Sequence, residues 1–267
     1  RRVLFRSIAL SAASGLLPDG THFAFQDPRQ APAPLEIADN QSNVDVVLAL
    51  PARRNGREEV IFSESADSLA RYLSFEREVD DFNAISVGPA AVQFGKLRLK
   101  LMLESELTAE WTAIGVTRVI EKRGDKQLRL DAGYIPPMLN AINHPLLFDY
   151  LNDIHGLLAQ RSQQIGQRLR QPGRFNTAEM VDFMLLALIN HHLGLVSHLK
   201  NLPLLHPEQL FSHWLAFAAE LSTWTPQRSP DAALPVYDHD DIARSFSKLM
   251  LLLRQGLSLV MEESAVQ

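Results

Sequence analysis

The spacing of hydrophobic residues changes at Tyr134-Ile135-Pro136-Pro137. Before this segment, hydrophobic residues recur at every second position, which is typical of strands with one buried face; after it they recur at spacings of three and four, as in amphipathic helices. The two prolines prevent a continuous strand or helix from crossing the segment. The sequence therefore predicts a two-part α+β chain, with an antiparallel β-sandwich domain at residues 8–137 and a four-helix bundle domain at residues 138–263.

Two stretches of the first part are the clearest predicted strands. Leu97–Leu103 places a leucine at every second position. Val44–Leu50 is more apolar, which indicates a strand near the centre of a sheet. Between such runs, Pro18-Asp19-Gly20 and Asn55-Gly56 predict tight turns, because these residues tolerate the backbone angles of a reversal.

One further hairpin and one loop are predicted in the same part. Gly124-Asp125 is expected to turn a strand at Ile114–Glu121 back into a strand at Gln127–Leu130. Gln26–Pro34 is rich in proline and alanine, so we expect an extended loop there. These reversals imply an antiparallel meander or sandwich.

Arg71–Asp81 combines large side chains with a dense set of charges, for which we weigh two interpretations. In a strand at the edge of a sheet, the charges would be solvated and would discourage unwanted strand pairing. In a cation site, four acids within six residues would be ligands, but their spacing matches no calcium-binding loop. The solvated edge strand is favoured; the acids are Glu76, Glu78, Asp80 and Asp81.

Start signals for four helices occur in the second part. Asn143-His144-Pro145 places a polar cap before a proline at the first helical position. Asn176, with Glu179 three residues later, forms a capping box for the second helix. His206-Pro207-Glu208 opens the third helix, and Asp238–Asp241 precedes the fourth.

The hydrophobic residues of these helices form stripes. Phe183–Leu199, in the second helix, is apolar almost all round, so we expect this helix to be the most buried. Short connections favour antiparallel neighbours and hence a bundle. A surplus stripe would bind another subunit, and the long first and fourth helices are the expected places for one. The stripes of the first, third and fourth helices comprise Leu147, Leu151, Ile154, Leu158, Ile165 and Leu169; Leu210, Phe211, Trp214, Leu215, Ala218 and Leu221; and Ile242, Phe246, Leu249, Leu253, Leu257 and Val260.

Composition narrows the classes of function. Hydrophobic residues make up 46% of the 267 residues, and the net charge of -5 gives no electrostatic reason to expect nucleic acid. The absence of cysteine excludes disulfides and cysteine-bearing zinc sites. The apolar stretch Met184–Ile189 is far shorter than the ~20 residues that cross a bilayer, so we expect no direct membrane insertion.

The first seven residues, Arg1–Ser7, resemble the translation of a sequencing-adapter oligonucleotide. We interpret residues 1–7 as non-native sequence and expect the native sequence to start near Ile8. A secretion signal is not indicated, because no adequate apolar segment and cleavage site follow the basic start.

Asp238–Asp241 is the strongest candidate for a metal site. Together with His191, His192 or His198 it would offer carboxylate and imidazole ligands, as a metal-dependent hydrolase requires. Structural roles explain the same acids, with Asp238 as the N-cap and the other two aspartates in the first turn, near the positive end of the helix dipole. We therefore predict no metal site, no cofactor and no catalytic residue.

Two other combinations are discounted as sites. Ser212 and His213 are adjacent, so they point in different directions on a helix, and no Gly-x-Ser-x-Gly nucleophile motif occurs. Gly88 and Gly95 belong to no phosphate-binding glycine motif. These two glycines are expected to permit a turn and the start of a strand.

Aromatic residues of the second part suggest packing and contact roles. Phe211, Trp214 and Phe217 recur at three-residue spacing, which indicates core packing more than a ligand groove. Trp224 and Tyr237 flank a proline-rich loop and are candidates for exposed partner contacts, because aromatic residues are enriched at interfaces.

Several short strings occur in a specific order along the chain. They are Leu16–Thr21, Arg71-Tyr72 with Glu78–Asp81, Leu97–Leu99 with Leu103–Glu106, Tyr134–Pro137, and Tyr237–Asp241. Each string is weak by itself, but together they resemble the TssK family, also called ImpJ or VasE, of bacterial type VI secretion baseplate subunits. The resemblance runs from about Ile8 to Glu262.

The resemblance implies a β-sandwich shell at residues 8–137 and a helical neck at residues 138–263. It also implies that the chain lacks the family's extreme N-terminal segment and its C-terminal head. Such proteins are cytoplasmic homotrimers, associated with the inner-membrane secretion complex. They join the baseplate wedge of TssF and TssG to the membrane complex of TssJ, TssL and TssM, which TssK contacts through the head.

The resemblance describes a structural component and not an enzyme. The partner-binding residues of this chain are unknown from its sequence. Two alternatives stay open: a metal-dependent hydrolase that uses Asp238–Asp241, and a ligand- or carbohydrate-binding module built on the sandwich, which would need exposed aromatic residues on its loops.

Overall fold

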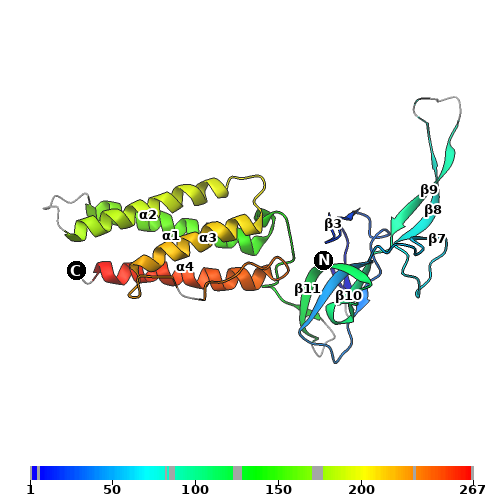
Figure 1. The fold of residues 1–267 in the computed structure, drawn as a ribbon, viewed down its shortest axis with the longest axis horizontal. Helices are drawn as coiled ribbons and strands as arrows, with labels where there is room; N and C mark the ends of the chain where they lie inside the picture. The colour runs from blue at the N-terminus through cyan, green and yellow to red at the C-terminus, as the bar shows by residue number, and fades with distance from the viewer. Residues whose placement is uncertain are drawn as a thin grey trace. The chain divides into compact units, whose positions relative to one another are not determined.

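The computed structural model describes residues 2–4, 7–81, 83, 88–122, 128–169, 177–230 and 233–265. The chain divides into two compact units, Arg1–Pro136 and Pro137–Gln267, so the division falls inside the Tyr134–Pro137 segment. Strands make up the regular structure of the first unit apart from one short 3-10 helix, and helices make up that of the second (Figure 1). The mixed α+β class predicted from the sequence is confirmed.

Strand β6 (Val44–Pro51) lies inside a four-stranded sheet. It pairs antiparallel with β10 (Lys100–Leu103) on one side and with β11 (Trp111–Lys122) on the other, and β12 (Leu128–Leu130) pairs with β11. The predicted pairing of Ile114–Glu121 with Gln127–Leu130 is confirmed, while the predicted turn at Gly124-Asp125 lies outside the described residues. Both faces of β6 are buried, with Val46, Leu48 and Leu50 in one cluster and Val47 and Ala49 in another.

Two smaller sheets share the larger of these clusters. Strands β1 (Arg2–Leu4), β2 (Ser7–Ala9) and β5 (Leu35–Glu36) form one, and β3 (Ala13–Leu16) pairs with β4 (His22–Phe25) in the other. Residues of β2, β3, β4 and β5 pack with the four-stranded sheet, which places one apolar core between the sheets. The core includes Ile8, Phe23, Phe25, Leu48, Leu101 and Val119.

Strands β7 (Val60–Ile61), β8 (Tyr72–Val79) and β9 (Ala90–Leu97) form a separate sheet. The pairing of β8 with β9 is antiparallel, but β7 is parallel to β8, so the predicted purely antiparallel arrangement is wrong here. The charged segment Arg71–Asp81 forms β8 and is largely exposed beyond Ser74, which agrees with a solvated strand.

The predicted single strand Leu97–Leu103 is also wrong, because β9 ends at Leu97 and β10 begins at Lys100. Arg98 lies in the break. Its guanidinium donates hydrogen bonds to the carbonyl oxygens of Ser65, Ser68 and Ala70, at 2.7 to 2.8 Å. These bonds hold the loop that brings β8 alongside β7.

Two of the predicted turns of the first unit are present. At Pro18-Asp19-Gly20, Gly20 has φ +80°, and the turn joins β3 to β4. Gly56 has φ +79° in the turn after β6. Both angles lie in the left-handed region that favours glycine. The expected loop at Gln26–Pro34 contains turns and no strand.

The second unit contains four α-helices among its described residues. They are α1 (Pro145–Leu169), α2 (Thr177–Leu199), α3 (Pro207–Leu221) and α4 (Ile242–Ala265), which lie alongside one another (Figure 1). The predicted start of α3 is confirmed, with Pro207 at the first position and the His206 side chain accepting a hydrogen bond from the Glu208 N–H. Asn176, the predicted cap of α2, lies outside the described residues.

The predicted stripes form the core of the helical unit. The stripe residues of α1 up to Ile165 are buried, as are those of α4 up to Leu257, and those of α3 except Leu215. The expected core packing of the α3 aromatic residues is confirmed: Phe211, Trp214 and Phe217 are at most 3% exposed. Polar contacts also join the helices, with Arg254 of α4 bonded to Asp153 of α1.

One expectation about the helices is wrong. The second helix is not the most buried: α2 buries five of its 23 residues, whereas α3 buries seven of 15. Among the side chains that the structure describes, exposed apolar residues gather on α2, whereas Phe148 of α1 and Leu251 of α4 are exposed singly. The α4 side chains after Ser258 lie outside the described ones, so the surplus stripe expected on the fourth helix stays a prediction. Because Phe183–Leu199 is apolar almost all round, α2 was expected to be buried on all sides. However, its neighbours α1 and α3 cover only one side of it.

Candidate functional site

The N-terminal half of α2 carries a group of exposed apolar side chains, which we call the α2 face. It consists of Met180, Val181, Phe183 and Met184, each between 46% and 59% exposed. The opposite side of the helix is buried through Leu185, Ile189, His192 and Val196. A group of adjacent exposed apolar side chains on a helix indicates an interaction surface and is not typical of a solvated one.

Asp182 lies within this surface but turns toward α1, where its carboxylate pairs with Arg168 at 3.3 Å. The α2 face itself is therefore free of charge. Among the described residues, α2 is the one helix long and apolar enough to cross a membrane, a property that core helices of soluble proteins share. Of its most apolar stretch, 22% is buried within the chain.

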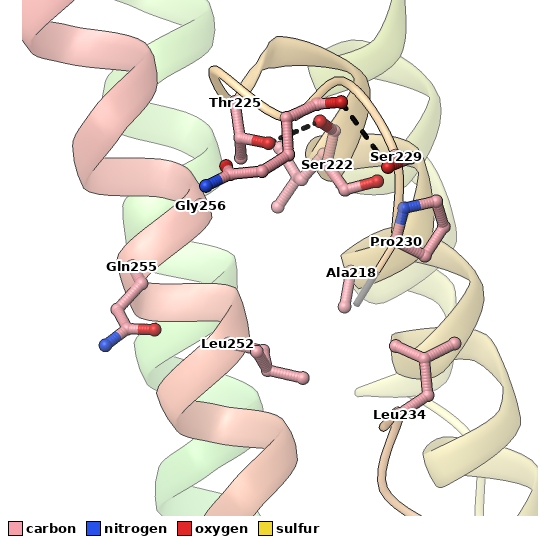
Figure 2. Close-up of a pocket in the computed structure, with 11 residues that line it drawn as sticks. Ala218, Ser222, Thr225, Ser229, Pro230, Leu234, Leu252, Gln255 and Gly256 are labelled. Carbon is pink, nitrogen blue, oxygen red and sulfur yellow. Dashed lines mark hydrogen bonds between the residues drawn. The ribbon is translucent and has the colours of Figure 1, made fainter. Parts of the chain in front are cut away.

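A cavity of about 620 Å³ lies between α3, α4 and the loop after α3 (Figure 2). Leu221, Leu234 and Leu252 give it apolar walls. Thr225 donates its hydroxyl hydrogen to the Ser222 carbonyl oxygen, so its hydroxyl is engaged by the backbone. None of the eleven described lining residues is ionisable, and the lining therefore offers no acid, base or activated nucleophile.

The Asp238–Asp241 segment serves the start of α4. The Asp241 carboxylate accepts a hydrogen bond from the Arg244 N–H at 3.2 Å, which is the geometry of an N-cap. The Asp238 carboxylate accepts from the Asp240 N–H at 3.0 Å, outside the helix. The predicted N-cap at Asp238 is therefore wrong by three residues, because the helix begins at Ile242.

The histidines proposed as additional metal ligands lie apart from these acids. His192 is buried and its Nε2 lies 2.9 Å from Oε2 of Glu220 on α3, while its ring lies 4.0 Å from that of Phe217. Burial lowers the pKa of His192, and Glu220 only partly opposes this, so the contact is a hydrogen bond to a neutral imidazole at neutral pH. Within the described part of the chain, no three His, Asp or Glu side chains converge as metal ligands would.

Tyr237 and His239 form a small polar cluster before α4. The Tyr237 hydroxyl lies 2.7 Å from Nδ1 of His239, and the His239 ring stacks on His206 at 5.3 Å. Burial raises the pKa of the Tyr237 hydroxyl and lowers that of His239, so both groups are neutral at neutral pH. Tyr237 also packs against Phe211, so it is a partly buried packing residue and not the exposed contact that was expected.

The remaining candidates have structural surroundings. Ser212 donates a hydrogen bond to the Glu208 carboxylate one turn earlier, and no imidazole lies between them. Gly88 has φ +74° just before β9, as expected for a turn. Gly95 lies inside β9, where a Cβ atom would come within 3.2 Å of Tyr72, so it permits close packing and not a strand start.

Aromatic residues of the first unit give little support to a ligand-binding module. Trp111 and Tyr72 lie in strands and are partly buried. Phe62, at 72% exposure, lies on a loop and is a single side chain. The α2 face was not among the sequence predictions. The signal for it was the all-round apolarity of Phe183–Leu199, because the two neighbouring helices cover only one side of α2.

Comparison with known proteins gives the class of the chain. Residues 4–267 match the family described as bacterial type VI secretion, VC_A0110, EvfL, ImpJ, VasE. The chain is 37% identical over 259 residues to the type VI secretion system baseplate component TssK1 of Pseudomonas aeruginosa. That alignment covers 97% of this chain and 58% of the relative, so the chain spans little more than half of its length.

Solved structures agree with this class. A crystal structure of TssK, 65% identical, matches with a TM-score of 0.90 over 94% of this chain and 59% of the other. A TssK-TssF-TssG baseplate subcomplex, at 24% identity, shows the same fold with a TM-score of 0.77 over 92% of this chain and 79% of the other. The chain thus belongs to a family of type VI secretion proteins. It belongs to the TssK family of baseplate proteins, as its short sequence strings indicated.

Proposed function

We propose that the chain is the shell and neck of a trimeric adaptor in the type VI secretion baseplate. The first unit is a β-sandwich shell, and the second is a four-helix bundle neck. The complete protein joins the wedge proteins TssF and TssG to the membrane complex of TssJ, TssL and TssM, with TssL and TssM bound through a head outside this chain. It acts in the bacterial cytoplasm without inserting into the membrane and without catalysis or a cofactor.

The apolar core between the sheets supports the assignment of the shell. The β6 sheet contributes Leu48 and Leu101 to one side of this core, and the smaller sheets contribute Ile8 and Phe23. Two packed sheets with a shared apolar core define a sandwich.

The contacts of the helical unit support the assignment of the neck. Contacts join α1 to α2 and α3 to α4. The His192–Glu220 contact joins α2 to α3, and the Arg254–Asp153 pair joins α4 to α1. Each helix therefore touches two others around one core, which is the arrangement of a bundle.

The α2 face is the main observation that supports a trimer. Four large apolar side chains in under two turns of helix, without a charge among them, are costly to leave in water. Association of three copies through this surface buries it, and burial of apolar area is the main favourable term in stable subunit interfaces.

Light scattering coupled to size-exclusion chromatography tests the trimer. The native protein is expected to elute as a trimer, and Phe183→Glu/Met184→Glu as a monomer with an unchanged helical circular dichroism spectrum. Val236→Glu is the control, because Val236 is 83% exposed in the same unit but lies outside α2. A stable monomer of the native protein at micromolar concentration contradicts the proposal.

The wedge connection is supported by the relative solved in a TssK-TssF-TssG subcomplex. Co-purification of the full-length protein with TssF and TssG from the same bacterium tests this connection. Recovery of both proteins is expected, and their absence while the trimer persists separates the wedge proposal from the trimer proposal.

A further inference from the structure

The hairpin of β8 and β9 presents a free strand edge. Among the described residues, β7 pairs with β8 only at Tyr72 and Leu73, whereas β9 pairs with β8 along its whole length. The edge of β8 from Ser74 to Val79 on the β7 side therefore has no paired strand in the described structure. Figure 1 shows the two strands projecting from the other strands of their unit. Such an edge offers backbone N–H and C=O groups to an added strand.

One face of the hairpin carries aromatic and aliphatic side chains together with Arg77. The register places Phe75 opposite Phe94 and Arg77 opposite Val92. The two phenylalanine rings stack with centres 5.7 Å apart, and the Arg77 guanidinium lies 5.0 Å from the Phe94 ring centre. Phe75 is still 45% exposed and Val92 39% exposed. A two-stranded ribbon is marginally stable alone, so covering this face would stabilise it.

The other face of β8 is acidic and lacks counter-charges. Glu76 and Glu78 alternate with the residues of the first face, are exposed, and form no ion pair with any described residue. Seven other acids among the described residues of the unit pair with an arginine; these pairs are Asp19–Arg71, Asp27–Arg29, Asp45–Arg118, Glu59–Arg53, Glu64–Arg98, Glu110–Arg54 and Glu121–Arg129. The hairpin thus combines a free backbone edge with an uncompensated negative row.

We propose that the β8 edge from Ser74 to Val79 binds, by strand addition, an extended segment of another protein in which basic and apolar residues alternate. The basic side chains of this segment pair with Glu76 and Glu78, and its apolar side chains cover Phe75 on the other face. A second copy of the same hairpin is a poor occupant, because edge-to-edge pairing brings two glutamate rows together. The inference adds to the proposed function and does not depend on the trimer.

Three synthetic peptides test the inference on the whole chain. The first repeats Lys-Val, the second repeats Glu-Val, and the third is the Lys-Val peptide with alternate backbone nitrogens methylated on its pairing edge, which removes N–H donors without changing charge. Fluorescence anisotropy is expected to detect binding of the first peptide, with affinity lower by about tenfold or more for each of the others, because they lose the cross-strand charge pairs or the backbone bonds.

Charge reversal on the protein supplies the matched comparison. Glu76→Lys/Glu78→Lys is expected to lower the affinity for the Lys-Val peptide by about tenfold or more. Glu36→Lys/Asp67→Lys makes the same change in net charge at exposed acids outside the hairpin and is expected to retain native affinity. Hydrogen exchange of the native protein should show protection that the peptide adds at Ser74–Val79.

Three results would overturn the inference. The first is no measurable binding of the Lys-Val peptide to the native chain. The second is equal affinity of both double variants for the Lys-Val peptide, which shows that the peptide is attracted to the overall charge of the protein and not to Glu76 and Glu78. The third is equal binding of the methylated peptide, or peptide-induced protection confined to other residues, which shows that no strand is added at this edge.

Discussion

Two buried arginines have opposite roles in stability. Arg71 is 1% exposed and uses both terminal nitrogens: it donates to the Pro51 carbonyl at 2.6 Å and to the Thr21 hydroxyl at 2.7 Å, and it pairs with Asp19 at 2.8 Å. Burial raises the pKa of Asp19, but hydrogen bonds from Thr21 and Arg71 outweigh it and lower this pKa. Arg161 is also buried, yet it bonds only to the neutral Gln164 among the described residues.

Arg71→Met is expected to destabilise the first unit by roughly 2 to 4 kcal/mol, because a buried carbonyl and a carboxylate lose their partner. Urea unfolding measures the free energy. Arg29→Met is the control. The Arg29 side chain is 90% exposed, so its ion pair with Asp27 should contribute little to the free energy of unfolding. A loss for Arg71→Met no larger than that of the control contradicts the structural role.

Arg161→Met is expected to leave the stability of the helical unit unchanged or to raise it. Burial lowers the pKa of the guanidinium, which reflects an unfavourable environment for its charge. An apolar side chain of similar length keeps the packing and removes this cost. The same urea experiment measures the free energy of unfolding of this variant. A loss of stability of more than about 1 kcal/mol contradicts the expectation and would reveal a partner of Arg161.

Stability of the helical unit should fall as the solution becomes acidic. The folded-state pKa of His192 lies below its ordinary value of 6.5, so the unfolded chain binds the proton more readily. The contribution of His192 is fully present above pH 6.5 and is lost as the pH falls toward and through the folded pKa. His155 and His239 shift in the same direction, because each is desolvated.

Thermal unfolding followed by circular dichroism between pH 5 and 8 measures this effect. The melting temperature is expected to fall on the acid side, and His192→Gln should reduce the slope because Gln cannot titrate. An identical slope in the variant shows that His192 does not contribute.

At the scale of elements, the close approach of α3 and α4 depends on one small residue. A Cβ atom at Gly256 would lie 3.2 Å from Cβ of Leu221, whereas a Cβ atom at Gly156 of α1 would meet nothing within 4 Å. Sequence periodicity identified the stripes of both helices. It could not show that Gly256 is a contact point, because that depends on which helix faces it.

Gly256→Leu is expected to destabilise the helical unit by about 1 to 3 kcal/mol through overpacking. Gly156→Leu makes the same chemical change in open space and should be neutral or stabilising by up to about 1 kcal/mol, because leucine favours the helix. Urea unfolding compares the two. If both variants behave alike, the contact between α3 and α4 at Gly256 is not close.

At the scale of the whole molecule, each unit has its own core, and the sequence contained most of the information for both. The change of periodicity at Tyr134–Pro137 coincides with the division of the chain, and the strongest stripes became buried faces. Local patterns failed where the outcome depends on distant partners. Leu97–Leu103 was split because Arg98 binds carbonyl groups about thirty residues earlier, and α2 stayed half uncovered because its cover is another chain in our proposal.

The Arg98 junction also separates the hairpin from the folding core. Apart from Leu97, no residue of β8 or β9 belongs to the larger apolar cluster described for the first unit. A junction of this kind lets the hairpin be lengthened, shortened or exchanged without a penalty inside the core. In our proposal, exchanging the hairpin would change which segment this strand edge binds while the core stays the same, so the hairpin is a suitable graft site for redirecting assembly.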